Sequence, residues 1–127
     1  MFNPRQFIEA ARILRSLHDV TARWDGRGRA EVVCHGDASP CNFVFQRGAP
    51  YALIDFDAAH PGTRAADVGY AAWLSLDIGN PELDPVVQGR RLAAFVGAYG
   101  ALHSPWMLLF PPWLRLTEGA NLASDAS

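Results

Sequence analysis

The sequence has 127 residues, of which 50% are hydrophobic and 19% charged, and its formal net charge at pH 7 is −2. A chain of this length and composition is expected to form one domain over residues 1–127 with a packed core, which excludes a globally disordered protein. The acidic balance argues against nucleic acid as the main partner, because binding to a phosphate backbone needs a basic face. All eleven basic residues are Arg.

The cysteines and the apolar stretches bear on the compartment. We interpret Cys34 and Cys41 as buried reduced thiols and not as a disulfide, because nothing in the sequence indicates an oxidising compartment. The N-terminus lacks the pattern of a signal peptide. The most apolar stretch, residues 106–114, is broken by two Pro residues and is far shorter than the ~20 residues of a membrane span. We therefore predict a cytoplasmic protein with no membrane partner.

The first predicted element is a helix from about Pro4 to Trp24. Asn3 can cap it, Pro4 suits its first position, and Gln6 completes a capping box. Apolar residues at helical spacing predict its buried face, which comprises Phe7, Ala11, Leu14, Leu17 or His18, Thr21 and Trp24. The Gly-containing segment 25–28 ends the helix.

Short strands come next. Residues 31–34 form the first, and residues 43–46 and 51–54 form a hairpin joined through residues 47–50. Because a hairpin brings together the residues before its first strand and after its second, we expect Asn42 and Asp55 to lie side by side.

The remaining elements are helical. A loop holding His60, Pro61 and Gly62 precedes a helix over residues 64–78 that ends at Gly79, and a further helix spans residues 85–102. One or two short helices are expected after Ser104 and Pro105. The large aromatic residues of this half are interpreted as core or interface, namely Trp73, Phe95, Tyr99, Trp106 and Trp113.

The most informative pattern is the segment from His35 to Asn42, here called the HGD loop. Together with the later Asp55-Phe56-Asp57 segment (the DFD segment), it sets carboxylates and a carboxamide on the loops that flank the hairpin. Transfer of a phosphoryl group needs a carboxylate to accept the proton of the attacking hydroxyl, and oxygen ligands to hold Mg²⁺ over the phosphates. The spacing of Asp37 and Asn42 is typical of a kinase catalytic loop, His-x-Asp-x-x-x-x-Asn.

These motifs, with Leu17-His18-Asp19 and the segment Asp67 to Ala71, resemble the aminoglycoside phosphotransferase and choline kinase family. The resemblance covers residues 14–99 and implies an α+β fold, namely the mainly helical C-terminal lobe of a protein-kinase-like fold with a short β-hairpin carrying the catalytic and metal-binding loops. It implies Mg²⁺ and ATP as cofactors and assigns the roles of five residues. Asp37 is then the catalytic base. Asn42 and Asp55 bind the metal and, through it, the nucleotide. His35 orders the HGD loop, and Asp67 braces that loop through its backbone amides.

Two departures from the family pattern stand out. Asp57 replaces the Gly of the protein-kinase Asp-Phe-Gly motif, so it either assists metal binding or caps the loop. The family's N-terminal lobe, which roofs the nucleotide and supplies a phosphate-binding Lys, has no counterpart here. The resemblance therefore implies a C-terminal lobe alone, with an incomplete nucleotide site.

Other polar residues have competing interpretations. His18 is read as a core histidine with satisfied hydrogen bonds, and Asp67 as structural rather than catalytic. Arg64 is either a bidentate phosphate contact or a surface residue at a helix start. His60 lies in a loop where substrate contacts occur. No His and Cys positions have convincing zinc spacing.

Two functions remain open. The first is transfer of the γ-phosphoryl group of ATP to a hydroxyl of a small molecule, with Glu82 and Asp84 as part of an acidic pocket for a cationic acceptor. The second is a truncated, non-catalytic or partner-dependent lobe that acts as an interaction module. In that case an exposed apolar face is expected to bind a second copy or a separate N-terminal lobe.

Overall fold

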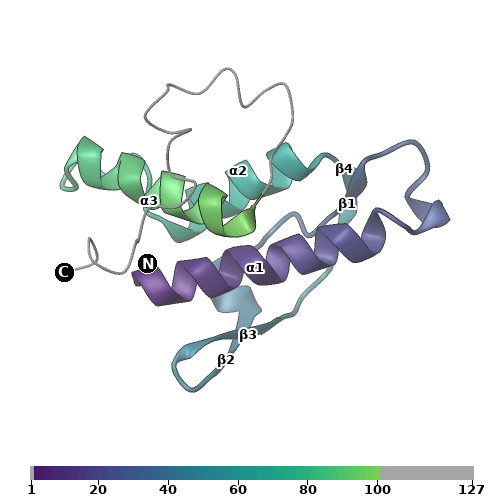
Figure 1. Cartoon of the computed structure of the whole chain (residues 1–127), viewed down its shortest axis with the longest axis horizontal. Helices are drawn as coiled ribbons and strands as arrows, with labels where there is room; N and C mark the ends of the chain where they lie inside the picture. Colours follow the sequence, from purple (N-terminus) through teal and green to yellow (C-terminus); the bar gives the residue numbers. More distant parts are fainter. Residues whose placement is uncertain (1, 101–127) are drawn as a thin grey trace.

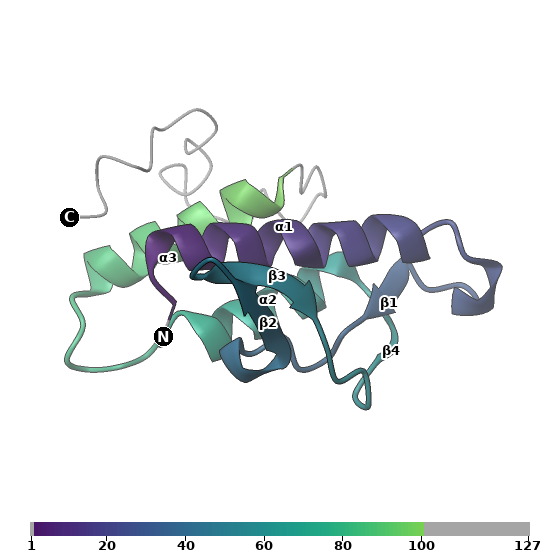
Figure 2. The ribbon, with the colours of Figure 1, turned by 90° about the horizontal axis from the view of Figure 1, so that it is seen from below.

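The computed structural model describes residues 2–100. Helix α1 (Pro4–Thr21) crosses the middle of this part, with α2 (Arg64–Ser75) and α3 (Pro85–Tyr99) on one side and the hairpin of β2 (Phe43–Gln46) and β3 (Ala49–Leu53) on the other (Figure 1). Seen from below, the hairpin lies in front of α2 (Figure 2). A second antiparallel pair, β1 (Val32–Cys34) with β4 (His60–Gly62), lies near the end of α1. Single 3₁₀ turns span Asp25–Arg27 and Pro40–Asn42. The predicted α+β class is confirmed.

Helix α1 begins as the sequence predicts and ends earlier. The Asn3 side chain accepts a hydrogen bond from the Gln6 amide, and the Gln6 side chain accepts one from the Asn3 amide, both at 2.9 Å. At the other end the amides of residues 23 and 24 bond to carbonyls three residues back, which tightens the last turn. The helix stops at Thr21, whose hydroxyl accepts the Val33 amide of β1 at 3.0 Å. The prediction that Trp24 lies on the buried face is wrong, because its side chain is 58% exposed.

The core lies where α1 meets α2, α3 and the first residue of β2. Its largest members are Phe2, Phe7, Leu14, Phe43, Leu76, Phe95 and Tyr99. Phe95 and Tyr99 are thus core residues as predicted, whereas Trp73 is 59% exposed. Trp73 points away from the core because positions 71, 72, 75 and 76, on the opposite face of the same helical segment, are the buried ones.

The hairpin has a shorter turn than predicted. Gln46 pairs with Ala49, so the turn consists of Arg47 and Gly48, both at positive φ (54° and 77°). Two-residue turns of this kind match the twist of the strands they join, and therefore β3 starts at Ala49 and not at residue 51. Beyond the last pair, Phe43 with Leu53, the Ile54 amide donates to the Asn42 carbonyl at 2.8 Å. This bond sets the DFD segment beside the end of the HGD loop.

Other boundaries differ from the prediction. Residues 60–62 are strand β4 and not a loop, because their backbone pairs with all of β1, which itself begins at Val32. Helix α2 stops at Ser75, and α3 stops at Tyr99 because Gly100 has a φ of +81°. The predicted C-terminal helices, with Trp106 and Trp113, lie outside the described residues.

The two cysteines have different surroundings. Both are free thiols, and Cys34 is buried as predicted. The prediction that Cys41 is buried is wrong, since this residue is exposed in the turn before β2. Among residues 2–100, no helix combines the length and apolar character that crossing a membrane requires.

Candidate functional site

The HGD loop brings Asp37 and Asn42 into direct contact. The Asn42 amide nitrogen donates to the carboxylate of Asp37 at 2.9 Å and to its backbone carbonyl at 2.8 Å. Asn42 is 7% exposed, whereas Asp37 is partly exposed. Because both amide hydrogens of Asn42 are used, its Oδ1 is the atom left to bind something else. Among residues 2–100, its only contact is one of 3.9 Å from the Cys41 thiol.

His35 is fully buried and orders the loop from within. Its Nδ1 accepts the Asp37 amide at 3.1 Å, and its Nε2 lies 2.9 Å from the Ile54 carbonyl. A ring nitrogen that accepts an amide hydrogen carries no proton, and one that faces a carbonyl must donate, so His35 is the neutral Nε2–H tautomer. The His35 ring thus joins the HGD loop to the residue before the DFD segment. The Phe56 ring stacks edge-on against it, with centroids 4.9 Å apart.

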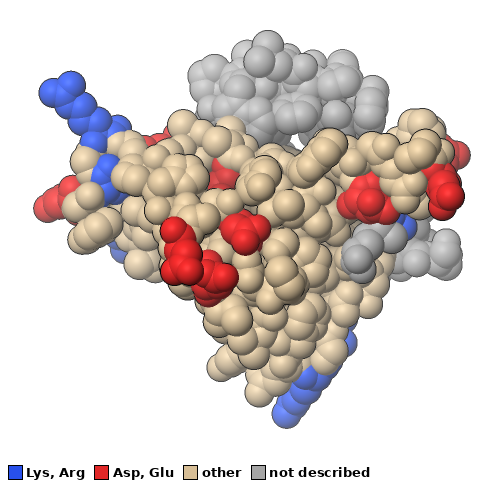
Figure 3. All heavy atoms as spheres, turned by 180° about the vertical axis from the view of Figure 1, so that it is seen from behind, with Lys and Arg blue, Asp and Glu red and all other residues tan. Residues whose placement is uncertain are grey.

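The DFD segment presents its carboxylates to solvent. Asp55 has a positive φ of 60°, and its carboxylate accepts the Asp57 amide at 3.4 Å. Asp55 and Asp57 are both exposed. Figure 3 shows acidic side chains gathered where the chain passes from β3 to β4, with Arg side chains at the margins of that face. A second acidic group lies where the chain passes from α2 to α3.

The donor set at the meeting of the two segments fits a hard divalent cation. Within residues 2–100, no three His, Cys, Asp or Glu side chains gather closely enough to hold a metal by themselves. The oxygens that the two segments offer are those of the Asn42 amide and the Asp55 carboxylate, and Asp57 follows two residues later. Mg²⁺ binds through one or two protein oxygens while keeping several waters or phosphate oxygens, so this small set suits it.

Asp67 braces the HGD loop from the interior. Its carboxylate accepts the His35 amide at 2.8 Å and the Gly36 amide at 3.1 Å, and it lies 2.7 Å from Nε2 of His18. Burial opposes the ionisation of Asp67, but the hydrogen bonds from His18 and from the two amides outweigh it and hold the pKa of Asp67 below its ordinary value. An ionised Asp67 therefore fixes the backbone just before Asp37.

The bracing network extends further than the sequence indicated. Nδ1 of His18 lies 2.7 Å from the Tyr99 hydroxyl. The same hydroxyl accepts a hydrogen bond from Nη1 of Arg64 at 3.1 Å. Arg64 bonds to Asp19 at 2.7 Å as well. Arg64 stands at the start of α2, as one of the two sequence interpretations had it, and its guanidinium is engaged by Tyr99 and Asp19. Its contact with phosphate stays a prediction. The signal available was the buried Tyr99, because a buried phenol needs a partner for its hydroxyl.

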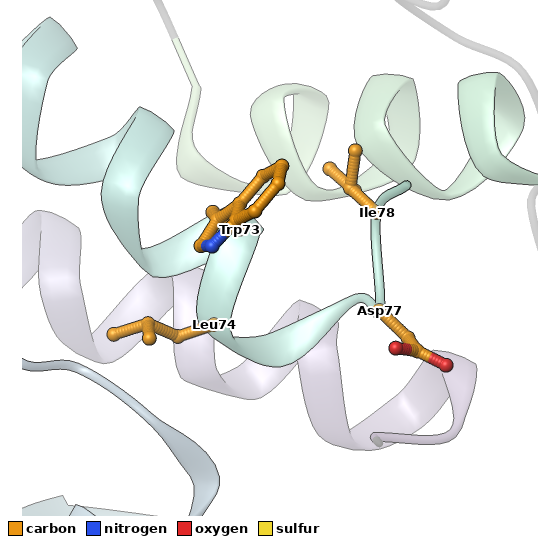
Figure 4. A pocket seen from close by; sticks show the side chains of 4 residues that line it. All are labelled: Trp73, Leu74, Asp77 and Ile78. Carbon is orange, nitrogen blue, oxygen red and sulfur yellow. The ribbon is translucent and has the colours of Figure 1, made fainter. Parts of the chain in front are cut away.

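A shallow cavity of about 370 Å³ lies beside the end of α2. Its lining residues are Trp73, Leu74, Asp77 and Ile78 (Figure 4). Trp73 and Ile78 project to the same side of this turn (Figure 4). Glu82 and Asp84, the acidic residues suggested by the sequence, do not line it, and the Asp84 side chain caps α3 instead. Ser75 connects this helix to the HGD loop through a 3.2 Å hydrogen bond to the Ala38 carbonyl.

Comparison with known proteins places these features in context. The model of the phosphotransferase enzyme family matches residues 4–106. The Trifolitoxin immunity protein of Rhizobium leguminosarum bv. trifolii is 31% identical over 91 residues, an overlap that covers 61% of this chain and 35% of that protein. The chain thus spans about a third of the length of this curated relative. No solved structure matches.

Proposed function

Because the chain belongs to the phosphotransferase enzyme family, we propose that it carries the catalytic and metal-binding loops of a kinase-like enzyme. In this proposal the lobe helps to transfer the γ-phosphoryl group of ATP to a hydroxyl group of a small molecule. The observation that carries it is the contact of Asp37 with Asn42 in a loop braced by Asp67, beside the exposed Asp55. This combination supports phosphoryl transfer because that chemistry depends on positioning and on charge neutralisation.

Asp37 is proposed to receive the proton of the attacking hydroxyl. One of its carboxylate oxygens accepts from Asn42, and the other accepts no hydrogen bond from residues 2–100. The free oxygen belongs to a side chain that is partly exposed and whose backbone is held by His35. A substrate hydroxyl can therefore reach it without disturbing the loop.

Asn42 and Asp55 are proposed to hold Mg²⁺, with Asp57 as an additional candidate. When bound, Mg²⁺ neutralises the charge that the transferred phosphoryl group carries. The contribution of the chain is to orient the ligands. Asn42 presents Oδ1 because its nitrogen is committed to Asp37, and the Ile54 to Asn42 backbone bond keeps Asp55 next to it.

The cavity beside Trp73 is the proposed region of acceptor contact. An exposed indole face and the Asp77 carboxylate favour a cationic or sugar-like molecule. The Asp77 carboxylate already accepts from the Asn80 side chain at 2.7 Å, so its remaining acceptor capacity is available to a ligand.

Paired substitutions test the proposal. Calorimetric titration of the chain with ATP and Mg²⁺ measures binding, and ATP turnover against a panel of hydroxyl compounds measures chemistry. We expect Asp37→Asn to reduce turnover by about 10³-fold or more while leaving nucleotide binding unchanged. We expect Asp55→Asn to weaken Mg²⁺-dependent binding by about 10-fold or more. Asp25→Asn, an exposed acid on a distant turn, is the control. Unchanged binding and turnover in both site variants would overturn the enzymatic proposal.

The exposed apolar side chains favour a second candidate function, an interaction module. Five of them belong to the hairpin and the segment after it, namely Val44, Phe45, Tyr51, Ile54 and Phe56, each at least 42% exposed. Exposed apolar side chains on a hairpin can form a contact surface for a protein partner, and we propose a second copy of the chain. Light scattering at micromolar concentration should then detect a dimer, and Phe45→Ser should dissociate it. Val20→Ser on α1 is the matched control, and a monomer in the unsubstituted chain contradicts this candidate.

A further inference from the structure

The hydrogen bonds behind the HGD loop form one chain with a fixed direction. The guanidinium of Arg64 can only donate, so the Tyr99 hydroxyl accepts from it. The Tyr99 proton then points to Nδ1 of His18, since the residues that the structure describes offer this hydroxyl no other acceptor. With Nδ1 accepting, His18 carries its proton on Nε2 and donates it to Asp67.

The surroundings support this direction at both ends. Burial raises the pKa of Tyr99 despite the nearby Arg64, so the phenol keeps its proton. Asp67 accepts hydrogen bonds from His18 and from two backbone amides, and it donates none. These three bonds suit an ionised carboxylate. Each atom that links this chain has at least one hydrogen-bond partner, which is the condition for a stable buried network.

Three helices supply the network. His18 lies near the end of α1, Arg64 is the first residue of α2, and Tyr99 is the last residue of α3. Figure 1 shows the start of α2 and the end of α3 on the same side of the second half of α1. Arg15 holds Tyr99 in place, with its guanidinium carbon 5.3 Å from the centre of the Tyr99 ring and its Nη1 bonded to the Tyr99 carbonyl at 3.1 Å.

We propose that Arg64 and Tyr99 are positioning residues for Asp37. Their contact orients the Tyr99 hydroxyl toward His18, which anchors both ring nitrogens of His18 and thereby keeps Asp67 on the amides of His35 and Gly36. Without the hydroxyl, Nδ1 of His18 is a buried acceptor with no donor, and the ring is held by Asp67 alone. The brace then loosens at the two amides that immediately precede Asp37. This inference rests on the proposed function only where turnover is measured.

Amide hydrogen exchange followed by NMR tests the brace without any need for activity. In Tyr99→Phe we expect the amides of His35 and Gly36 to exchange about 10-fold faster relative to the Leu14 amide in the core of α1. The Leu14 amide reports general loss of stability and is the internal reference. Tyr70→Phe removes a hydroxyl from a side chain that is 48% exposed and should change neither ratio. Equal acceleration at all three amides in Tyr99→Phe would reduce Tyr99 to a general stabilising residue and overturn the proposal.

A double-mutant cycle tests whether Arg64 acts through Tyr99. Arg64→Leu should accelerate exchange at His35 and Gly36 in the natural background and add nothing in the Tyr99→Phe background. An additive effect would show that Arg64 acts by another route and would overturn its part of the proposal. The imidazole nitrogen shifts of His18 give an independent signature. They should report a neutral Nε2–H ring in the unsubstituted chain, and the opposite tautomer would contradict the proposed direction.

Turnover provides the link to the proposed function. Tyr99→Phe should lower kcat about 10-fold with an unchanged KM for ATP, because the loop is less well positioned while the metal ligands are intact. If the unsubstituted chain shows no turnover, the proposed function fails on its own, and the exchange ratios still decide this inference. If the exchange ratios respond but kcat does not, the brace exists without positioning Asp37.

Discussion

The two sides of the HGD loop differ in how completely their polar groups are paired. On the inner side, the amides of His35 and Gly36 bond to the buried Asp67, which is 3% exposed. On the outer side, Asp37 keeps an oxygen without a partner among residues 2–100, and the Asp55 carboxylate is exposed. The same short loop therefore joins a closed network to an open one.

The difference shows how a rigid loop can present reactive groups. Side-chain atoms that bind a ligand must be free of hydrogen bonds within the protein. Such atoms therefore cannot hold the loop in place themselves. The order comes from the inner side, where His18, His35 and Asp67 satisfy one another and the backbone. We expect substitutions on the inner side to change stability, and substitutions on the outer side to change binding and turnover.

The largest expected effect is the loss of the inner carboxylate. Asp67→Asn replaces an acceptor of three hydrogen bonds by an amide whose nitrogen faces other donors. We expect the free energy of unfolding to fall by about 3 kcal/mol, because the remaining amide oxygen cannot serve all three donors, and at least one of them is left unpaired in a buried setting. Urea unfolding followed by circular dichroism measures the change.

Asp57→Asn is the matched control on the outer side. This exposed carboxylate accepts no hydrogen bond from residues 2–100, so its loss should change stability by no more than about 0.5 kcal/mol. If both variants lose the same stability, the hydrogen bonds of the inner side stabilise the fold no more than the exposed groups of the outer side.

A pair of glycines provides a second contrast, between a packed and an open position. Gly36 and Gly48 both have positive φ, 85° and 77°. A Cβ at Gly36 would lie 2.4 Å from the Ala58 carbonyl oxygen, whereas a Cβ at Gly48 would meet nothing within 4 Å. We expect Gly36→Ala to cost about 3 kcal/mol and Gly48→Ala about 1 kcal/mol, the latter from backbone conformation alone. Thermal unfolding of the two variants measures the gap, and equal losses would mean that the loop can move away from Ala58.

The sequence predicted much of the fold because its signals are local. The capping box of Asn3 and Gln6, the helical apolar spacing and the hairpin with its flanking Asn42 and Asp55 all depend on neighbouring residues. The errors arose where tertiary contacts decide. Helix α1 ends at Thr21, whose hydroxyl accepts the Val33 amide of β1, and residues 60–62 become a strand because β1 lies beside them.

The site divides in the same way. The spacing of Asp37, Asn42 and Asp55 is visible in the sequence, and so is the acid at position 67, although the roles of these residues stay predictions. The link from Arg64 through Tyr99 to His18 joins positions up to 81 residues apart, and no local pattern contains it. Such networks follow from packing, which fixes the distances only once the helices have met.

Acid should weaken the inner side selectively. Because the pKa of Asp67 in the folded chain lies below its ordinary value of 3.8, ionised Asp67 stabilises the fold fully above that value, and this stabilisation is lost as the pH falls through the folded pKa. The difference in unfolding free energy between the unsubstituted chain and Asp67→Asn should be constant from about pH 7 to pH 5 and should shrink by about pH 3. Urea midpoints measure it, and a gap that widens on acidification contradicts the sign.

Thiol labelling compares the inner and outer sides of the HGD loop without any substitution that changes the free energy of unfolding. Cys34 is 1% exposed on the inner side, and burial, followed by the charges of Asp67 and Glu31, raises its pKa to about 11. Cys41 is exposed on the outer side. A thiol reagent at neutral pH should therefore modify Cys41 at least about 100-fold faster than Cys34, because reaction needs both access and thiolate. Mass spectrometry, with Cys41→Ser as the control, measures the two rates. Equal rates would mean that the inner side opens as readily as the outer side, since Cys34 can react only when β1 separates from the residues that cover it.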